Sequence, residues 1–200
     1  MERFTTLTAI AAHYARPNVD TDLIIRVERC ARVPRAELGR WAFEMVRYAP
    51  GGAENPDFVL NRAPWRAAKI LVCAENFGCG SSREMAVWAL AGMGIRCVIA
   101  PSFGQIFFDN CLQNGLLAVR LPAPDVARLA QLAGDPATAS MTVDLERQSI
   151  NGAIRFEVDA LKKKMLLEGL DEIGLTLARK AAIDAFQHAD RGRRPWAYPA

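Results

Sequence analysis

The stretch "AAKILVCAENFGCGSSREMAVWALAGMGIRCVIAP" at residues 67–101 decides the fold. Residues 67–75 form a short apolar run, which is typical of a strand buried on both faces of a sheet. A glycine-rich turn follows, and residues 81–94 carry apolar side chains at helical spacing and end in two glycines. A second buried strand is predicted at 95–101. Strand, helix and strand within roughly 30 residues predict the βαβ unit of a parallel sheet.

The flanking segments extend this α/β pattern. Residues 35–49 predict a helix, and the glycine- and proline-containing segment 50–57 predicts a loop. Residues 102–115 predict a further helix with Ser102 as its N-cap, and residues 116–121 predict a third strand.

The C-terminal half changes character. Residues 124–134 predict a short helix, and residues 141–158 alternate apolar and polar side chains around Asn151-Gly152, a strong hairpin signal. Closing helices are predicted over 159–190, the last beginning near Asp171, and residues 191–200 are expected to be a loose tail. The whole chain, 1–200, is therefore expected to form a single α/β domain with a parallel βαβ unit, an antiparallel hairpin and C-terminal helices.

Composition narrows the classes of protein. Of the 200 residues, 51% are hydrophobic and 24% are charged, as in ordinary globular domains. We expect a cytoplasmic protein with no membrane role, because no apolar run is long enough to span a bilayer and the N-terminus has no convincing cleavage site. Five scattered cysteines suggest neither a disulfide framework nor a metal site within the chain. The net charge of +3, with basic runs that lack interleaved aromatics, disfavours nucleic-acid binding.

The turn "NFGCGSSRE" at 76–84 carries the candidate chemistry. Its two glycines permit backbone conformations and close approaches that other residues forbid. Ser81 and Glu84 fit an S-x-x-E capping box, which gives the turn a purely structural explanation. That explanation leaves Ser82 and Arg83 without a role. Two hydroxyls and a guanidinium at a positive helix end would instead bind a carboxylate or phosphate.

Other templates fit this turn poorly. It matches neither a P-loop nor the G-x-S-x-G elbow of α/β-hydrolases. Cys79 is a weak candidate nucleophile, because the two histidines, His13 and His188, lie near the chain ends.

A second polar cluster lies in "RPNVDTDLIIR" at 16–26. Asp20, Thr21 and Asp22 precede an apolar run that ends at Arg26. One interpretation is a turn that leads into a strand. The alternative is that these side chains face the same crevice as Arg83, and the sequence alone leaves both open.

Several motifs resemble those of one known family. The motifs are "NVDTDLII", "NPDFVLN", "ENFGCGSSRE", "VIAPSF" and "GLDEIGLTL". Together they resemble the small subunit of 3-isopropylmalate dehydratase, an aconitase-like hydro-lyase of leucine biosynthesis. The resemblance implies an aconitase-type swivelling β/β/α domain that is active only with a separate large subunit. It also implies that the [4Fe–4S] cluster belongs to that partner and that this chain binds no metal.

The resemblance also implies roles for the two clusters. Ser81 matches the position whose hydroxyl oxygen removes the carbon-bound proton. Ser82 and Arg83 match substrate-binding positions, and Arg83 also stabilises a nearby anionic oxygen. Asp22 matches an acidic active-site position. Thr21 and Arg26 are expected to lie on the substrate side of the same crevice.

Two departures from the family pattern bear on the substrate. Arg26 and Val27 stand where the family often has Pro and Lys, and Met85 stands where it often has His. Another alkylmalate or a homocitrate-like di- or tricarboxylate therefore remains an alternative substrate. A second alternative, from another class, is a non-catalytic carboxylate-binding or regulatory module that uses the same fold.

Overall fold

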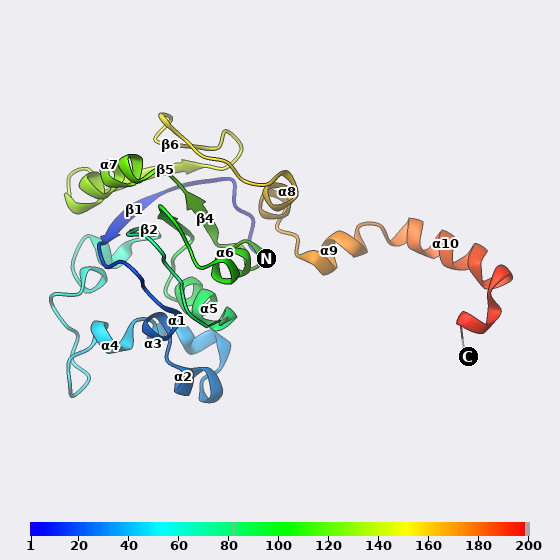
Figure 1. Cartoon of the computed structure of the whole chain (residues 1–200), viewed down its shortest axis with the longest axis horizontal. Helices are drawn as coiled ribbons and strands as arrows, with labels where there is room; N and C mark the ends of the chain where they lie inside the picture. The colour runs from blue at the N-terminus through cyan, green and yellow to red at the C-terminus, as the bar shows by residue number, and fades with distance from the viewer. Residues whose placement is uncertain (82, 199–200) are drawn as a thin grey trace.

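A seven-stranded sheet organises the chain, and the computed structural model describes residues 1–81 and 83–198 (Figure 1). The strands lie in the order β4-β3-β2-β1-β5-β6-β7. Their bounds are β1 Thr6–Tyr14, β2 Ile70–Cys73, β3 Cys97–Ala100, β4 Leu117–Arg120, β5 Ser140–Asp144, β6 Ser149–Ile150 and β7 Ile154–Arg155. The first four strands in this order are parallel, and β5, β6 and β7 continue from β1 as an antiparallel meander.

Strand β1 is central, because it pairs with β2 in parallel and with β5 in antiparallel orientation. No strand is predicted for this segment from the sequence. Its threonines and alanines give only a shallow alternation of polar and apolar residues. Tertiary pairing on both edges therefore decides its structure more than its own pattern does.

The sheet separates two hydrophobic cores, and the strands alternate strictly between them. In β2, Leu71 and Cys73 face one core, whereas Ile70 and Val72 face the other. The neighbouring strands β3 and β4 divide in the same way. All four residues of β2 are buried, which confirms the predicted two-sided burial of the parallel unit.

Helices cover both faces of the sheet, with α7 and α8 on one side and α1 to α5 on the other (Figure 1). The α-helices are α1 Thr21–Ile24, α2 Val27–Arg32, α3 Leu38–Trp41, α4 Glu44–Arg47, α5 Glu84–Gly92, α6 Gln105–Gln113, α7 Ala123–Gly134, α8 Ala160–Glu168, α9 Glu172–Leu177 and α10 Lys180–Arg193. Short 3-10 helices are η1 Arg35–Glu37, η2 Val59–Asn61, η3 Trp65–Ala67 and η4 Pro195–Ala197. Within the residues that the structure describes, no helix is both long and apolar enough to cross a membrane.

The helix predicted over 35–49 is interrupted. It consists of η1, α3 and α4, and the break falls at Phe43, whose φ is +57°. Phe43 is buried against Tyr14 and Phe58, with ring centroids 5.4 and 5.6 Å away. Burial of this ring in the aromatic cluster offsets the cost of a left-handed backbone conformation.

The predicted N-cap of α6 is wrong, whereas the predicted hairpin is confirmed. Helix α6 begins at Gln105 with Gly104 as N-cap, so Ser102 does not cap it. Instead, the Ser102 hydroxyl accepts a hydrogen bond from the backbone N–H of Asn76 at 2.9 Å. The hairpin at Asn151-Gly152 is confirmed, since β6 and β7 pair on either side of it.

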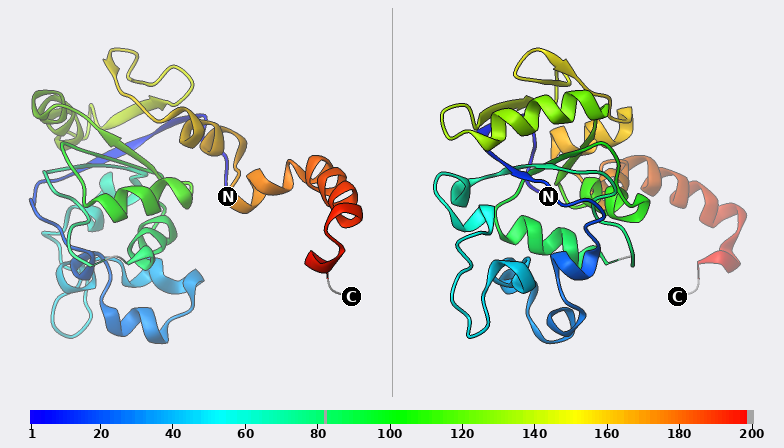
Figure 2. Two further views of the ribbon diagram at one scale, coloured as in Figure 1. Left: turned by 45° about the vertical axis from the view of Figure 1, so that its right-hand side comes forward. Right: turned by 60° about the vertical axis from the view of Figure 1, so that its left-hand side comes forward.

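The C-terminal region differs most from the predicted closing helices. Helix α8 packs onto the body through buried Met165 and Leu166. The segment predicted as one helix beginning near Asp171 does begin there, with Asp171 as N-cap, but it divides into α9 and α10. Both helices extend away from the sheet (Figures 1 and 2). Residues 191–193, expected in a loose tail, continue α10. We call residues 170–198 the C-terminal arm.

We predict that Gly39→Ala destabilises the domain. A Cβ on Gly39 would lie 2.1 Å from the carbonyl carbon of Gly92, at the contact between α3 and α5. The expected loss in unfolding free energy is about 2–3 kcal/mol, measured by denaturant unfolding. Gly134→Ala is the matched control, because a Cβ added at Gly134 would meet nothing within 4 Å and alanine favours a helix. Equal effects from both substitutions would contradict the close helix contact.

Candidate functional site

The turn with the two glycines links the end of β2 to the start of α5. Helix α5 begins at Glu84, and its N-cap is Arg83, with no side-chain capping hydrogen bond. Ser81 therefore lies before the helix, and the predicted Ser81–Glu84 capping box is wrong. The Glu84 side chain instead accepts a hydrogen bond from the Asn114 amide at 2.8 Å.

The segment 18–22 runs alongside this turn. The carbonyl of Val19 accepts hydrogen bonds from the N–H groups of Gly78 and Cys79, at 2.7 and 3.1 Å. The N–H of Thr21 donates to the carbonyl of Cys79 at 3.0 Å. Two polar clusters far apart in the sequence are thereby held together by the main chain. The alternative interpretation requires the two clusters to be neighbours, as they are, and a shared crevice stays a prediction.

The local structure of the first cluster differs from the predicted turn into a strand. Residues 21–24 form helix α1, and Asp20 is its N-cap, with its carboxylate accepting from the N–H of Leu23 at 2.7 Å. The cap orients the start of α1, so that Thr21 points inward and Asp22 points toward Arg83.

Gly78 is required by the packing beneath the turn. Its φ is +72°, and a Cβ would lie 2.2 Å from the ring of Phe107. The backbone also approaches closely on the other side, because a Cβ on Gly104 would lie 2.3 Å from the carbonyl oxygen of Gly78. The turn is thus pressed against α6 and cannot move inward.

The polar groups of the two clusters meet at the exposed edge of the turn. Arg83 and Asp22 form an ion pair, with side chains 20% and 52% exposed. The hydrogen bond with Asp22 raises the pKa of the Arg83 guanidinium, which stays protonated. We call Thr21, Asp22, Ser81 and Arg83 the polar lip.

Ser81 is held at this lip by its backbone. Its carbonyl accepts hydrogen bonds from the Thr21 hydroxyl at 3.0 Å and from the N–H of Arg83 at 2.9 Å. The residue itself is exposed, whereas Thr21 is only 1% exposed. Ser82, predicted as a substrate-binding residue, lies outside the described residues. The lip therefore presents Ser81 and the cation of Arg83 at a solvent-facing edge.

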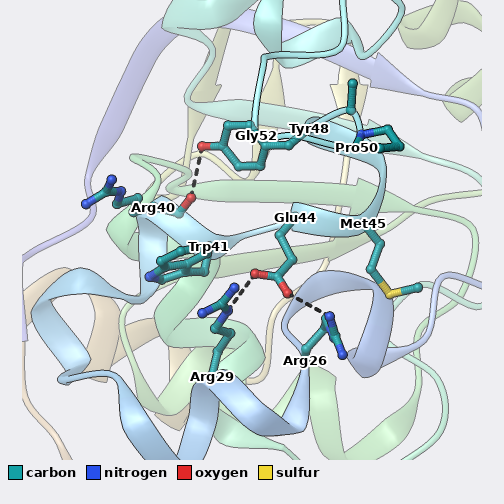
Figure 3. Close-up of a pocket in the computed structure, with 10 residues that line it drawn as sticks. Arg26, Arg29, Arg40, Trp41, Glu44, Met45, Tyr48, Pro50 and Gly52 are labelled. Carbon is teal, nitrogen blue, oxygen red and sulfur yellow. Dashed lines mark hydrogen bonds and ion pairs between the residues drawn. The ribbon is translucent and has the colours of Figure 1, made fainter.

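Arg26 is the N-cap residue of α2, four residues after Asp22. Its guanidinium pairs with Glu28 at 3.1 Å and Glu44 at 3.3 Å. It lines a cavity of about 540 Å³ together with Arg29, which pairs with Glu44 at 2.7 Å and stacks on Trp41 (Figure 3). A substrate-binding role for Arg26 stays a prediction.

Several thiols of the chain are buried, which lowers their reactivity. Burial raises the pKa of the thiols of Cys73, Cys97 and Cys111, which disfavours reactive thiolates. Burial also raises the pKa of Cys30, although the nearby positive charge of Arg83 opposes this. Among residues 1–81 and 83–198, no three His, Cys, Asp or Glu side chains are grouped so that they could hold a metal ion.

Some residues that hold the turn in place are not apparent from the sequence motifs. Asn76, with a φ of +57°, donates through its side-chain amide to Asn18 at 2.9 Å, in addition to its backbone bond to Ser102. The available signal was positional, since Asn76 and Ser102 each follow a parallel strand and such strand ends meet at one edge of a sheet.

Comparisons with known proteins agree with this arrangement. The family model described as "Aconitase C-terminal domain" matches residues 1–124, and the model of the C-terminal domain of the 3-isopropylmalate dehydratase small subunit matches residues 172–200. The 3-isopropylmalate dehydratase small subunit of Dinoroseobacter shibae is 53% identical, covering 98% of this chain and 100% of that protein. The corresponding protein of Rhodospirillum rubrum is 51% identical, covering 98% and 97%.

The chain belongs to the family of 3-isopropylmalate dehydratase small subunits. A crystal structure of 3-isopropylmalate dehydratase from Methanocaldococcus jannaschii superposes with a TM-score of 0.66 at 25% identity, covering 90% of this chain and 98% of that one. These findings confirm the predicted aconitase-type α/β fold and the assignment to a hydro-lyase of two subunits. They favour that assignment over a non-catalytic regulatory module.

We predict that Thr21→Val loosens the lip without unfolding the domain. The substitution keeps the buried volume but removes the hydroxyl that donates to the Ser81 carbonyl. Unfolding free energy should fall by about 1 kcal/mol, and amide hydrogen exchange at residues 79–81 should accelerate.

Thr8→Val is the matched control, because the Thr8 hydroxyl pairs with that of Thr142 at 2.8 Å on the exposed side of β1 and β5. It should leave exchange in the turn unchanged. Unaltered exchange at 79–81 in Thr21→Val would show that this hydrogen bond does not hold the lip.

Proposed function

We propose that the polar lip is this chain's contribution to the active site of 3-isopropylmalate dehydratase, which interconverts 2- and 3-isopropylmalate by dehydration and rehydration. The observation that carries the proposal is the meeting of the two clusters. Hydrogen bonds from segment 18–22 hold the turn so that Arg83, paired with Asp22, stands beside Ser81. Main-chain hydrogen bonds thus fix the positions of polar side chains at the surface. This arrangement favours a role of these side chains in binding over a role in stability.

In this proposal Arg83 binds a substrate carboxylate. The guanidinium has five N–H donors in a planar fork, so it can bind a second anion while one edge contacts Asp22. The ion pair with Asp22 and the limited exposure of the Arg83 side chain, 20%, together fix the orientation of the guanidinium. Ser82 is proposed to assist at the same carboxylate. Thr21, only 1% exposed, is proposed to support the site indirectly, through the hydrogen bond from its hydroxyl to the Ser81 carbonyl. Asp22 acts both as the partner of Arg83 and as an acidic group of the site.

Ser81 is proposed as the base that takes the carbon-bound proton. A serine hydroxyl is a poor base in water, but a neighbouring guanidinium stabilises its alkoxide, and it does so more strongly when water no longer screens the two charges. The guanidinium of Arg83 supplies the positive charge. The hydrogen bond from the Arg83 backbone N–H to the Ser81 carbonyl fixes the spacing of the two residues. Water exclusion must come from elsewhere, because Ser81 and Asp22 are exposed in this chain.

A large subunit that closes over the lip would supply that enclosure. We propose that this partner carries a [4Fe–4S] cluster, which would act as the Lewis acid that accepts the departing hydroxyl. The lip fits a complementary role, because it offers a cation and hydroxyl oxygens, and the described residues offer no cluster of thiolates. We further propose that the assembled enzyme works in the cytoplasm.

We predict that Ser81→Ala abolishes turnover in the enzyme reconstituted with its large subunit. The loss should be at least about 10³-fold, because the general base is removed, while assembly is retained. The measurement is 2-isopropylmalate conversion under anaerobic conditions after iron and sulfide are added. Ser140→Ala, at an exposed position in β5, is the control and should turn over normally.

Arg83→Lys should separate binding from proton removal. Lysine keeps the charge but loses the fork, so KM for the substrate should rise at least about tenfold with a smaller fall in kcat. Near-normal kinetics in both Ser81→Ala and Arg83→Lys would reject the proposed roles.

The two departures near the lip make substrate identity a separate question. Arg26 and Met85 replace residues common in the family, and Arg26 borders the cavity in Figure 3. A panel of 2- and 3-isopropylmalate, other alkylmalates and homocitrate should give the highest kcat/KM for the isopropylmalates. Activity confined to a homocitrate-like acid would reject that substrate while leaving the lip's chemistry intact.

A further inference from the structure

The C-terminal arm carries an apolar stripe that nothing in the described chain covers. Helix α10 places Ala182, Ala185, Phe186 and Ala189 on one side, since these positions fall within about 100° of one another at 3.6 residues per turn. All four residues are exposed, and Phe186 is 61% exposed. An isolated helix of 14 residues is marginal in water without packing of its apolar face.

The tip of the arm is nevertheless ordered by its own contacts. The Asp190 carboxylate accepts hydrogen bonds from Arg194, the shortest at 2.7 Å, and from the Tyr198 hydroxyl at 3.0 Å. This folds η4 back against α10 and leaves Trp196 77% exposed. A helix with an ordered end and two exposed aromatics resembles a pre-organised binding element, because such aromatics commonly dominate interface energetics.

The root of the arm adjoins the proposed active site. Glu172, the first residue of α9, accepts a hydrogen bond from the Gln113 amide at 3.3 Å. The residue after Gln113, Asn114, donates to Glu84 at 2.8 Å, and Glu84 directly follows Arg83. A partner that closes over the polar lip would therefore lie beside the arm.

Charge and family membership indicate which partner this is. Residues 179–194 contain five Lys and Arg but only two Asp, so two such arms laid together would repel. An apolar groove with an acidic rim would attract them. The arm also has its own family model, the C-terminal domain of the 3-isopropylmalate dehydratase small subunit, whereas residues 1–124, which include β1 to β4, match the aconitase C-terminal domain.

We propose that α10 docks by its Phe186 stripe into an apolar, acid-rimmed groove on the large subunit of the same enzyme. The proposal rests on the proposed function, which requires such a partner. The arm then tethers the two subunits beside the lip, so that the lip can close over substrate without leaving the complex.

One titration tests this proposal separately from the catalytic one. A fixed amount of large subunit is titrated with the full-length chain, and dehydratase activity is recorded. The midpoint reports affinity and the plateau reports turnover. Phe186→Asp should raise the midpoint at least tenfold and leave the plateau within twofold, whereas Ser81→Ala should lose the plateau and keep affinity in a direct binding assay.

His188→Asp is the matched control, because it introduces an aspartate on the same helix at a position about 160° around the axis from Phe186. Its midpoint should stay within threefold of the original chain. Trp196→Ala is a second variant at the tip and should raise the midpoint without altering helix content by circular dichroism. Light scattering of the chain alone tests self-association.

The possible outcomes are distinct. A shift in midpoint for Phe186→Asp but not His188→Asp supports the docking helix. An unchanged midpoint in both Phe186→Asp and Trp196→Ala overturns it. Loss of a dimer in Phe186→Asp, with no change in large-subunit affinity, assigns the stripe to a second copy of the chain and also overturns the proposal.

Discussion

The site depends on the hydrogen bonds that the carbonyl of Val19 accepts. By accepting the N–H groups of Gly78 and Cys79 it joins the segment after β1 to the segment after β2. Val19 is fully buried, so these hydrogen bonds are shielded from water and their loss would leave polar groups unpaired in the core. Every polar group of the lip projects from one of these two segments. The positions of Asp22, Ser81 and Arg83 relative to one another are therefore set by the main chain.

This constraint explains why the turn needs glycine at Gly78. The main chain must pass between the Val19 carbonyl and the ring of Phe107, a passage with no room for a Cβ. Its positive φ then turns the chain back toward solvent before α5 begins. A side chain here would displace the turn from the buried carbonyl, and the exposed lip would move with it. A packing requirement in the core thus determines the geometry of a surface site.

The sequence predicted the parts of the fold that rest on local pattern. The βαβ unit, α7 and the hairpin at Asn151-Gly152 follow from periodicity and turn residues. The strand β1 and the break at Phe43 did not, because pairing on two edges and burial of one ring determine them. At the site, the sequence identified the polar residues but not their neighbours. The Arg83–Asp22 pair needs a contact between segments far apart in the chain, and the pairing of Arg26 with Glu44 likewise depends on tertiary structure.

The solvent exposure of the lip is consistent with a subunit that works only in a complex. A proton acceptor that depends on a dry, positively charged environment cannot act at an open edge. In the proposed function such a surface would stay inert until its partner arrives. In the proposed function the lip opens and closes against the large subunit, so the small subunit would need a second contact that persists while the lip is open. The C-terminal arm has its own ordered tip. Its root lies near Glu84, and the arm extends away from the sheet. Such an arm meets that requirement better than a larger rigid interface around the lip would. In these proposals the sheet positions the lip and α10 contacts the partner, which accounts for the contrast between the buried sheet and the exposed α10.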